Sequence, residues 1–209
     1  MRIPFTKTDI KFKSFKFKKV KYIDDSFGVY LITGKQGTNK TYYAVYLCTL
    51  QDLKRVNYIK TNIHSLKIPG VKIEYFNKIE EIYFDTDKNC IYVIDELSRK
   101  YKKDSPCDKH LYAFMNQCRK RNRIFIGITQ EYRELPMWLR RPCRYTLNNV
   151  PIRFFSRFGL YKCIIGDGYN LTYNKDENEY ECPTIQNSIY KRNNYIASMY
   201  DTFEPINEL

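Results

Sequence analysis

The stretch of sequence that decides the fold is Gly34-Lys35-Gln36-Gly37-Thr38-Asn39-Lys40-Thr41. An apolar run, Phe27–Thr33, precedes it and is typical of a strand buried on both faces. The pattern after it, Lys40–Leu53, has apolar residues at helical spacing. In a glycine-bearing turn between a strand and a helix, backbone N–H groups converge on phosphate oxygens, helped by the positive end of the helix. The stretch therefore predicts a phosphate-binding loop.

The last residues of this loop have the chemistry of a nucleotide site. Lys40 is expected to reach the β- and γ-phosphates of ATP, and the Thr41 hydroxyl to ligate Mg²⁺. One position departs from the pattern G-x-x-x-x-G-K-[ST], because Asn39 replaces the second glycine. Asparagine is among the best non-glycine residues at positive φ, so we expect the loop to tolerate it. Taken alone, the motif also fits an ordinary strand–helix turn that contains Lys-Thr.

A pair of acidic residues follows a second apolar run. The run Cys90–Ile94, which predicts a second buried strand, ends directly in Asp95 and Glu96. In an open parallel sheet, the carboxyl ends of the strands line the same crevice as a phosphate loop. Asp95 is expected to hold Mg²⁺ through water, and Glu96 to polarise the attacking water. Such a pair is also common at the start of a helix, so it is the order of the two motifs that favours an ATPase.

A third apolar run, Ile124–Thr129, ends at Gln130. If its strand lies beside the phosphate loop, the Gln130 side chain is expected near the γ-phosphate and the attacking water. The alternative is a solvent-facing residue at the end of a strand.

ATPases of this kind usually need a cation that stabilises charge on the transferred phosphoryl group, often supplied by a neighbouring subunit. Arg119 and Arg123 lie near the end of a predicted helix, Asp108–Arg123, and Arg140 and Arg141 lie in the segment WLRRP. A solvated or structural role is the alternative for each of these arginines.

The remaining patterns complete an α/β fold. Further strands are predicted at Val56–Ile63, Val71–Phe76, Ile152–Phe155, Leu160–Ile165 and Tyr169–Tyr173, with a packed tail from Cys182. Alternating strands and helices indicate a doubly wound, mainly parallel sheet, here with a C-terminal β-hairpin extension. We therefore expect a basic N-terminal strand or arm over residues 1–26, an ATPase core over 27–147, and the extension and tail over 148–209.

The composition is strongly basic. The formal net charge of +13, from 36 basic and 23 acidic residues, favours a polyanionic partner such as nucleic acid, or an anionic membrane surface. Lysines alternate with apolar residues over Lys11–Ile23, which predicts either a half-buried strand protected at a sheet edge or a basic arm on nucleic acid. A generally basic, soluble surface is the alternative.

Cysteine usage and hydropathy exclude several classes. The seven cysteines form no CxxC, and with two histidines they assemble no zinc pattern, so we expect reduced, mostly buried thiols. The N-terminus has no apolar signal region, and no apolar run approaches the roughly 18 residues of a membrane span. We therefore expect a soluble protein.

The ordered set GKQGTNKT (34–41), IYVIDE (91–96) and IFIGITQ (124–130) resembles the FtsK/HerA superfamily of P-loop DNA-translocating ATPases. Within it, the chain is most similar to viral genome-packaging ATPases and to zonula occludens toxin-like assembly proteins of filamentous phages. The resemblance spans about Phe27 to Arg144 and implies a RecA-like core. It also implies ATP and Mg²⁺ as cofactors. By the same resemblance, Lys40 and Thr41 have the nucleotide-loop roles, Asp95 and Glu96 the acidic-strand roles, and Gln130 the sensor role.

The resemblance implies partners as well. Family members form homo-oligomeric rings, usually hexamers, that move DNA without sequence preference. A packaging enzyme is expected to have a capsid or portal-vertex protein as a further partner. Since no membrane segment is predicted, the packaging type is favoured over the phage assembly type, and the expected location is the host cytoplasm or the virion. The alternatives are a phage extrusion motor docked on a membrane complex, and a nucleic-acid-binding structural protein whose P-loop is degenerate at Asn39.

Overall fold

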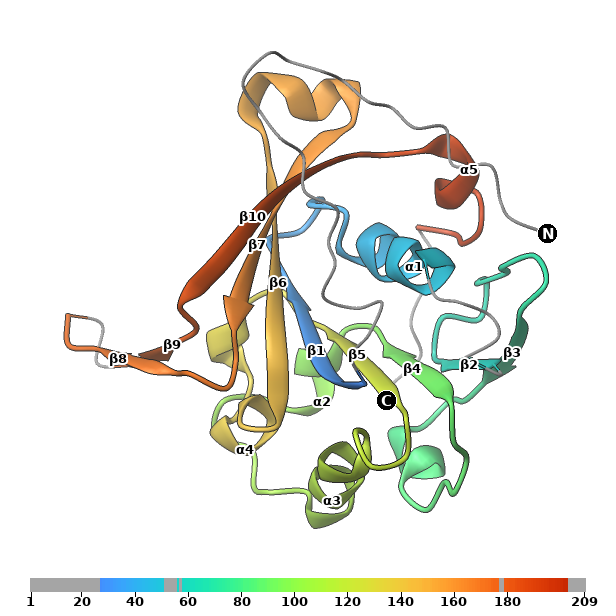
Figure 1. Cartoon of the computed structure of the whole chain (residues 1–209), viewed down its shortest axis with the longest axis vertical. Helices are drawn as coiled ribbons and strands as arrows, with labels where there is room; N and C mark the ends of the chain where they lie inside the picture. Colours follow the sequence, from blue (N-terminus) through green and yellow to red (C-terminus); the bar gives the residue numbers. More distant parts are fainter. Residues whose placement is uncertain (1–26, 51–55, 57, 177–178, 203–209) are drawn as a thin grey trace.

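The structure, a computed structural model, describes residues 27–50, 56, 58–176 and 179–202. An eight-stranded sheet forms its centre, in the order β10-β7-β6-β1-β5-β4-β2-β3 (Figure 1). The predicted strand at Lys11–Ile23 and the N-terminal arm lie outside the described residues.

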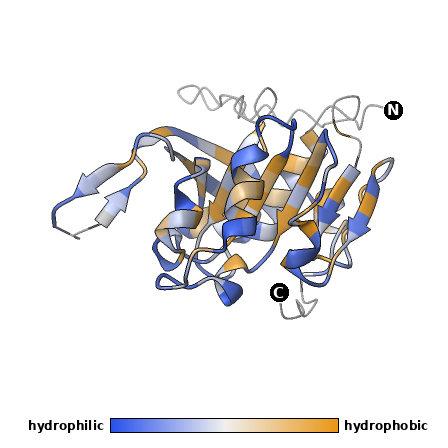
Figure 2. Ribbon diagram, turned by 90° about the horizontal axis from the view of Figure 1, so that it is seen from below, coloured by the Kyte–Doolittle hydropathy of each residue, from blue (hydrophilic) through white to orange (hydrophobic). Residues whose placement is uncertain are grey.

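Strands β1 to β6 pair in parallel, whereas at one edge β7 pairs antiparallel with both β6 and β10. A separate two-stranded ribbon, β8–β9, projects away from the sheet and is hydrophilic, while the central strands are hydrophobic (Figure 2). The prediction of a doubly wound, mainly parallel sheet is confirmed. The strands are β1 (Gly28–Thr33), β2 (Tyr58–Thr61), β3 (Lys72–Tyr75), β4 (Cys90–Ile94), β5 (Ile124–Ile128), β6 (Cys143–Pro151), β7 (Leu160–Asp167), β8 (Thr172–Asn174), β9 (Glu179–Glu181) and β10 (Thr184–Lys191).

Helices cover both faces of the sheet, which explains why the central strands are apolar throughout. Along β1, Val29 and Leu31 pack into one core, and Tyr30 and Ile32 pack into the other. The second of these cores lies under α1 (Lys40–Leu50) and α5 (Asn194–Ala197). The first lies under α2 (Leu97–Lys100), α3 (Lys109–Gln117) and α4 (Met137–Arg140). Short 3-10 turns complete the fold at η1 (Ile79–Ile82), η2 (Tyr132–Glu134) and η3 (Arg153–Phe158).

The helix α1 is buried more widely than its predicted stripe, because the C-terminal segment packs on its outer side. The Tyr42 hydroxyl accepts a hydrogen bond from the Asn193 backbone N–H at 2.8 Å. The rings of Tyr43 and Tyr190, the latter from β10, lie 4.8 Å apart between centroids. The segment predicted as a tail from Cys182 thus forms a strand and a short helix that belong to the core.

The predicted helix Asp108–Arg123 is shorter than expected. Asp108 caps it by accepting from the N–H groups of His110 and Leu111, and the helix ends at Gln117. Asn122 then takes a left-handed φ of 53°, which turns the chain back toward β5. The basic residues that follow Gln117 were expected on the last turn of the helix. They lie instead in the turn after it.

The segment after β6 also differs from the prediction. Residues expected as a strand at Ile152–Phe155 form the 3-10 turn η3, and β6 instead runs over Cys143–Pro151. The strand expected at Leu160–Ile165 is present as part of β7. Since β6 passes through the expected domain boundary at residue 147, the C-terminal extension continues the same sheet.

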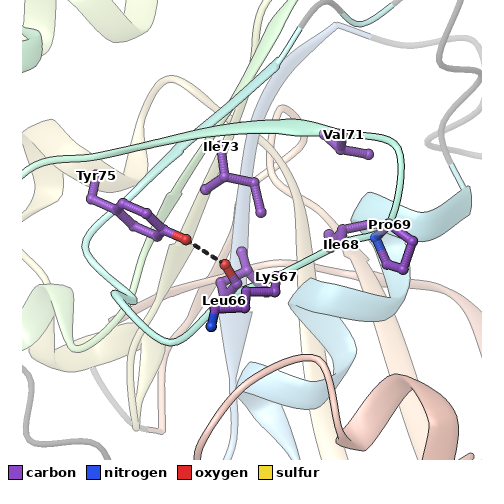
Figure 3. Close-up of a pocket in the computed structure, with 7 residues that line it drawn as sticks. All are labelled: Leu66, Lys67, Ile68, Pro69, Val71, Ile73 and Tyr75. Carbon is purple, nitrogen blue, oxygen red and sulfur yellow. Dashed lines mark hydrogen bonds between the residues drawn. The ribbon is translucent and has the colours of Figure 1, made fainter.

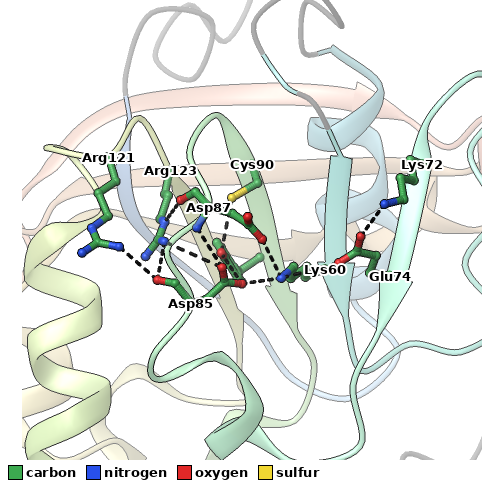
Figure 4. Close-up of polar contacts among 9 residues, drawn as sticks. Lys60, Lys72, Glu74, Asp85, Asp87, Cys90, Arg121 and Arg123 are labelled. Atoms are coloured by element: carbon green, nitrogen blue, oxygen red, sulfur yellow. Dashed lines mark hydrogen bonds and ion pairs between the residues drawn. The ribbon is translucent and has the colours of Figure 1, made fainter.

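A buried polar network links Lys60 of β2, the loop before β4 and the residue that precedes β5 (Figure 4). The Arg123 side chain is 1% exposed, and its Nε and Nη2 donate to the backbone carbonyls of Asp87 and Asp85, each at 2.6 Å. Lys60 forms ion pairs with the carboxylates of the same two aspartates. The donors and acceptors of this network satisfy one another, which indicates a structural role. We call the network the polar clamp.

A shallow groove lies at the β3 edge of the sheet (Figure 3). Its lining is mainly apolar, with Leu66, Ile68, Val71 and Ile73, and the Tyr75 hydroxyl donates to the Leu66 carbonyl at 2.7 Å. The strand β3 lies at the opposite end of the β1-β5-β4-β2 series from the phosphate loop, so this groove is not part of the nucleotide site.

Candidate nucleotide-binding site

The loop between β1 and α1 has a backbone that only certain residues allow. Gly34 has φ 143°, and a Cβ there would lie 2.5 Å from both the Asn149 carbonyl oxygen and the Thr38 Oγ1. Its N–H donates to the Gln130 carbonyl at 2.9 Å, which joins the loop to the end of β5. Thr38 closes the loop by donating to the Lys35 carbonyl at 2.8 Å through its hydroxyl. The first glycine of the motif is therefore required by close backbone approach.

Asn39 adopts the left-handed conformation that the motif requires at this position, with φ 61°. Its carbonyl accepts from the Tyr43 N–H at 3.0 Å and so opens α1. Its Nδ2 is buried and has no hydrogen-bond partner within the described part of the chain. A buried donor without an acceptor is costly in a folded protein, and an anion in the loop is the kind of group that would satisfy it.

Lys40 points back across the loop. Its Nζ donates to the Lys35 carbonyl at 3.1 Å. Burial lowers the pKa of Lys40, and the carboxylates of Asp95, Glu96 and Glu134 oppose this shift. The ammonium group thus lies in a partly desolvated position, where its attraction for a phosphate is screened less than it would be in bulk water.

Thr41 and Asp95 meet although they are 54 positions apart in the sequence. The Thr41 hydroxyl donates to Asp95 Oδ2 at 2.7 Å, and Asp95 Oδ1 accepts from the Glu96 N–H at 2.8 Å. Asp95 is 7% exposed, and burial raises the pKa of its carboxyl group, while the hydrogen bonds from Thr41 and Glu96 lower it. The predicted metal-binding pair is therefore assembled in one place.

The donor set fits Mg²⁺, which prefers carboxylate and hydroxyl oxygens and takes its remaining ligands from phosphates and water. Within the residues that the structure describes, no group of three or more His, Cys, Asp or Glu side chains could hold a metal ion. That is compatible with a magnesium site of the nucleotide type, because one or two protein ligands suffice there.

Asn62 supports this pair and was not predicted from the sequence. It lies just beyond β2 and is buried, and its side-chain oxygen accepts from the Asp95 N–H at 2.8 Å. Its Nδ2 donates to the Asp95 carbonyl at 3.1 Å. Asn62 therefore holds the end of β4 in place. The only sequence signal was a polar residue at the carboxyl end of a predicted strand.

Glu96 has a strained backbone and a charged neighbour. Its φ of 56° and ψ of 42° are left-handed, a conformation that costs a non-glycine residue free energy and is concentrated at functional sites. Its carboxylate forms an ion pair with Arg99 of α2. The side chain is 38% exposed, so it is accessible to water beside the loop.

Gln130 lies directly beside the loop. The strand β5 is the parallel neighbour of β1, and the Gln130 carbonyl accepts from the Gly34 N–H at 2.9 Å. The Gln130 side chain is exposed. Gln130, the residue predicted as a sensor, is thus adjacent to the first residue of the phosphate loop.

The four candidate arginines lie away from this loop. The turn that contains Arg119 and Arg123 precedes β5, and the segment with Arg140 and Arg141 precedes β6, so both are at the amino edge of parallel strands. Arg119 and Arg141 are exposed. Arg123 is held in the polar clamp, and Arg140 is 3% exposed with its guanidinium 5.1 Å from the centre of the Tyr132 ring. None of the four therefore approaches the loop of its own chain.

These features define a P-loop NTPase. They are a glycine-bearing loop with a lysine and a threonine at the start of a helix, and an acidic pair on a nearby parallel strand that is joined to this loop. The sequence agrees with this geometry over residues 30–149, which match the ATPase family associated with various cellular activities (AAA). The chain belongs to this AAA family, and it is an ATPase of the P-loop type.

Solved structures of the same fold include two kinds of protein. The N-terminal domain of zonular occludens toxin from Neisseria meningitidis superimposes with a TM-score of 0.60 at 18% identity, covering 84% of this chain and 100% of that domain. The genome packaging NTPase B204 from Sulfolobus turreted icosahedral virus 2, in complex with AMPPCP, superimposes with a TM-score of 0.50 at 13% identity, covering 81% of this chain and 98% of that one. The resemblance expected from the sequence motifs is confirmed at the level of the fold.

Among curated protein sequences, none matches the chain significantly. Of the helices in the described residues, none has both the length and the apolar character needed to cross a membrane.

Proposed function

We propose that this protein is an ATP-driven motor that translocates DNA, and that it packages a viral genome. The observation that carries the ATPase part is the hydrogen bond of 2.7 Å between Thr41 and Asp95, because it joins the phosphate loop to the acidic strand. The motor part is supported by the formal charge of +13, which suits a phosphate backbone, and by the fold shared with a packaging NTPase.

The residues of the site divide the reaction among them. Backbone N–H groups of the loop and the Lys40 ammonium bind the phosphates, while Thr41 and Asp95 hold Mg²⁺. When bound, Mg²⁺ neutralises charge that develops on the phosphate oxygens. Glu96 polarises the attacking water, and Gln130 senses the γ-phosphate from the end of β5. The positions and chemistry of these residues in the site support these roles.

The proposal includes a ring. Since no candidate arginine approaches the loop of its own chain, the cation that stabilises the transition state is supplied by a neighbouring subunit, with exposed Arg119 a better candidate than buried Arg140. A homo-hexamer that contacts DNA without reading its sequence, and that docks on a capsid or portal-vertex protein in the host cytoplasm, is the assembly we propose.

A phage extrusion motor is the second candidate function. It is favoured by the full coverage of the zonular occludens toxin N-terminal domain by this chain. Packaging and extrusion share the nucleotide chemistry and differ in partners, so co-purification with a capsid protein supports packaging, whereas membrane association that depends on other phage proteins supports extrusion.

The test is ATP hydrolysis by the purified full chain, with and without DNA, beside Glu96→Gln. We expect DNA to raise the turnover, and the substitution to lower it by roughly 10²- to 10⁴-fold because it removes the general base, with ATP binding unchanged. Equal turnover in Glu96→Gln would remove Glu96 from the mechanism. Turnover that DNA leaves unchanged would contradict the coupling to translocation.

The ion pair between Glu96 and Arg99 leads to a separate prediction. We expect Arg99→Ala to raise basal ATP hydrolysis about 2- to 5-fold, because partly exposed ion pairs contribute up to about 1 kcal/mol and this pair restrains the Glu96 carboxylate. The control is Lys100→Ala, since Lys100 pairs with Glu80 instead. A fall in turnover in Arg99→Ala would show that Arg99 positions Glu96 for the reaction rather than restraining it.

A further inference from the structure

The turn η3, between β6 and β7, exposes three phenylalanines at its surface. Phe154, Phe155 and Phe158 are 66%, 53% and 61% exposed. Two arginines accompany them, with the Arg153 guanidinium 5.7 Å from the Phe154 ring centre and the Arg157 guanidinium 5.2 Å from that of Phe158. Clustered exposed rings on one short turn are unusual for a surface that faces only water. We call Arg153–Phe158 the aromatic tip.

The two sequence segments that form and adjoin the aromatic tip carry charge of one sign. No aspartate or glutamate occurs between residues 148 and 166, or between residues 183 and 200. The Arg192 N–H donates to the Gly159 carbonyl at 2.7 Å, which brings the end of β10 beside the tip. Exposed Lys191 and Arg192 therefore add to the two arginines of the tip. Each of these basic groups would attract an anionic partner, and these two segments contain no carboxylate side chain that would repel it.

The aromatic tip is also linked to the nucleotide site. The strand β6 runs parallel to β1, so its carboxyl end lies at the same edge of the sheet as the phosphate loop (Figure 1). Asn149 of β6 is 1% exposed, and its Nδ2 donates to the Asn39 carbonyl at 3.4 Å. Only three residues separate Asn149 from the start of η3. Only the last residues of β6 and the residue after it would thus lie between a ligand on the aromatic tip and the contact of β6 with the phosphate loop.

We propose that the aromatic tip binds single-stranded nucleic acid, with unpaired bases stacked on its phenylalanine rings and guanidinium planes and the phosphates paired with its arginines. This deepens the proposed function, on which it rests, by naming the form of nucleic acid and the residues that contact it. Phenyl rings and arginine planes are the groups on which unpaired bases stack, with little dependence on sequence. In a duplex the base faces are already stacked on one another, so the rings would have no surface to bind.

The test compares binding of a labelled oligothymidine and of a duplex of equal length to the full chain, by fluorescence anisotropy. We expect the double variant F154A/F158A to bind the single strand at least roughly 30-fold more weakly, because each lost stacking platform contributes about 1 kcal/mol or more. The matched control is Y173A/Y180A, which removes two exposed rings from the β8–β9 ribbon. The variant F154W/F158W keeps stacking, and we expect it to keep binding and to lose tryptophan fluorescence when the single strand is added.

Each other outcome overturns the proposal in a distinct way. Unchanged single-strand binding in F154A/F158A would remove the aromatic tip as the contact. If the same variant instead lost binding to vesicles of anionic lipid, the tip would be a membrane-surface element, and if it altered only the oligomeric state, a subunit contact. Wild-type protein that hydrolyses ATP but binds neither single strand nor duplex would overturn the proposed DNA motor itself, whereas single-strand binding that survives in the variant would overturn only the role of the tip.

Discussion

Lys40→Ala is expected to weaken ATP binding by about 30- to 150-fold. The Lys40 ammonium is half-buried and donates to the Lys35 carbonyl of the loop, so it is placed to pair with a phosphate bound there. A hydrogen bond to a charged group contributes about 2 to 3 kcal/mol, which corresponds to this change in the dissociation constant. Titration with a fluorescent ATP analogue in the presence of Mg²⁺ measures it.

The control for this substitution is Lys109→Ala, which removes one positive charge from an exposed position at the start of α3. We expect it to leave the dissociation constant for the ATP analogue unchanged. Equal binding by Lys40→Ala and wild type would mean that the loop does not hold the nucleotide through this lysine. That result would favour the alternative of a nucleic-acid-binding structural protein with a degenerate loop.

Arg123→Ala is expected to destabilise the fold by about 3 to 5 kcal/mol, the loss typical of removing one partner from a buried charged network. Its guanidinium donates to two backbone carbonyls and lies 4.8 Å from the centre of the Phe114 ring, so both hydrogen bonds and packing are lost. Thermal unfolding would shift downward by on the order of 10 °C for a domain of this size. Chemical denaturation followed by circular dichroism gives the free energy directly.

The matched control is Arg119→Ala, four residues earlier in the same turn and exposed, which we expect to change the free energy of unfolding by less than about 0.5 kcal/mol. The same pair of variants separates structure from catalysis. A stable Arg119→Ala protein that has lost DNA-stimulated hydrolysis would support Arg119 as the cation supplied to a neighbouring subunit. An Arg123→Ala protein as stable as wild type would contradict the clamp.

Parts of the fold followed from local sequence patterns. The strand predicted at Cys90–Ile94 has those bounds, and Leu111, Phe114, Met115 and Cys118, which are apolar residues at helical spacing in the predicted helix Asp108–Arg123, are buried. Asn39 has the left-handed φ that its place in the motif demanded. Each of these features depends on the residues themselves and their near neighbours, through hydrophobic periodicity or the steric limits of one backbone position.

Other parts did not follow from such patterns. Asn62 supports Asp95 from another strand, and no local pattern distinguishes it from a polar residue in a turn. The segment after Cys182 was expected as a tail, yet β10 pairs along the whole of β7 and its Tyr190 packs on α1. The basic run after α3 was expected on the helix, but Arg123 is instead drawn into a polar network built from residues 60, 85 and 87.

By itself, the sequence determined that this chain has a phosphate loop between a buried strand and a helix, and an acidic pair at the end of another buried strand. The tertiary structure decided which of these residues meet. The order of strands brings Thr41 to Asp95 across 54 residues, places Asn62 under β4, and turns four candidate arginines away from the loop of their own chain. The physical reason is that backbone conformation and burial are set by near neighbours, whereas contacts across a sheet depend on the order and register in which its strands pair.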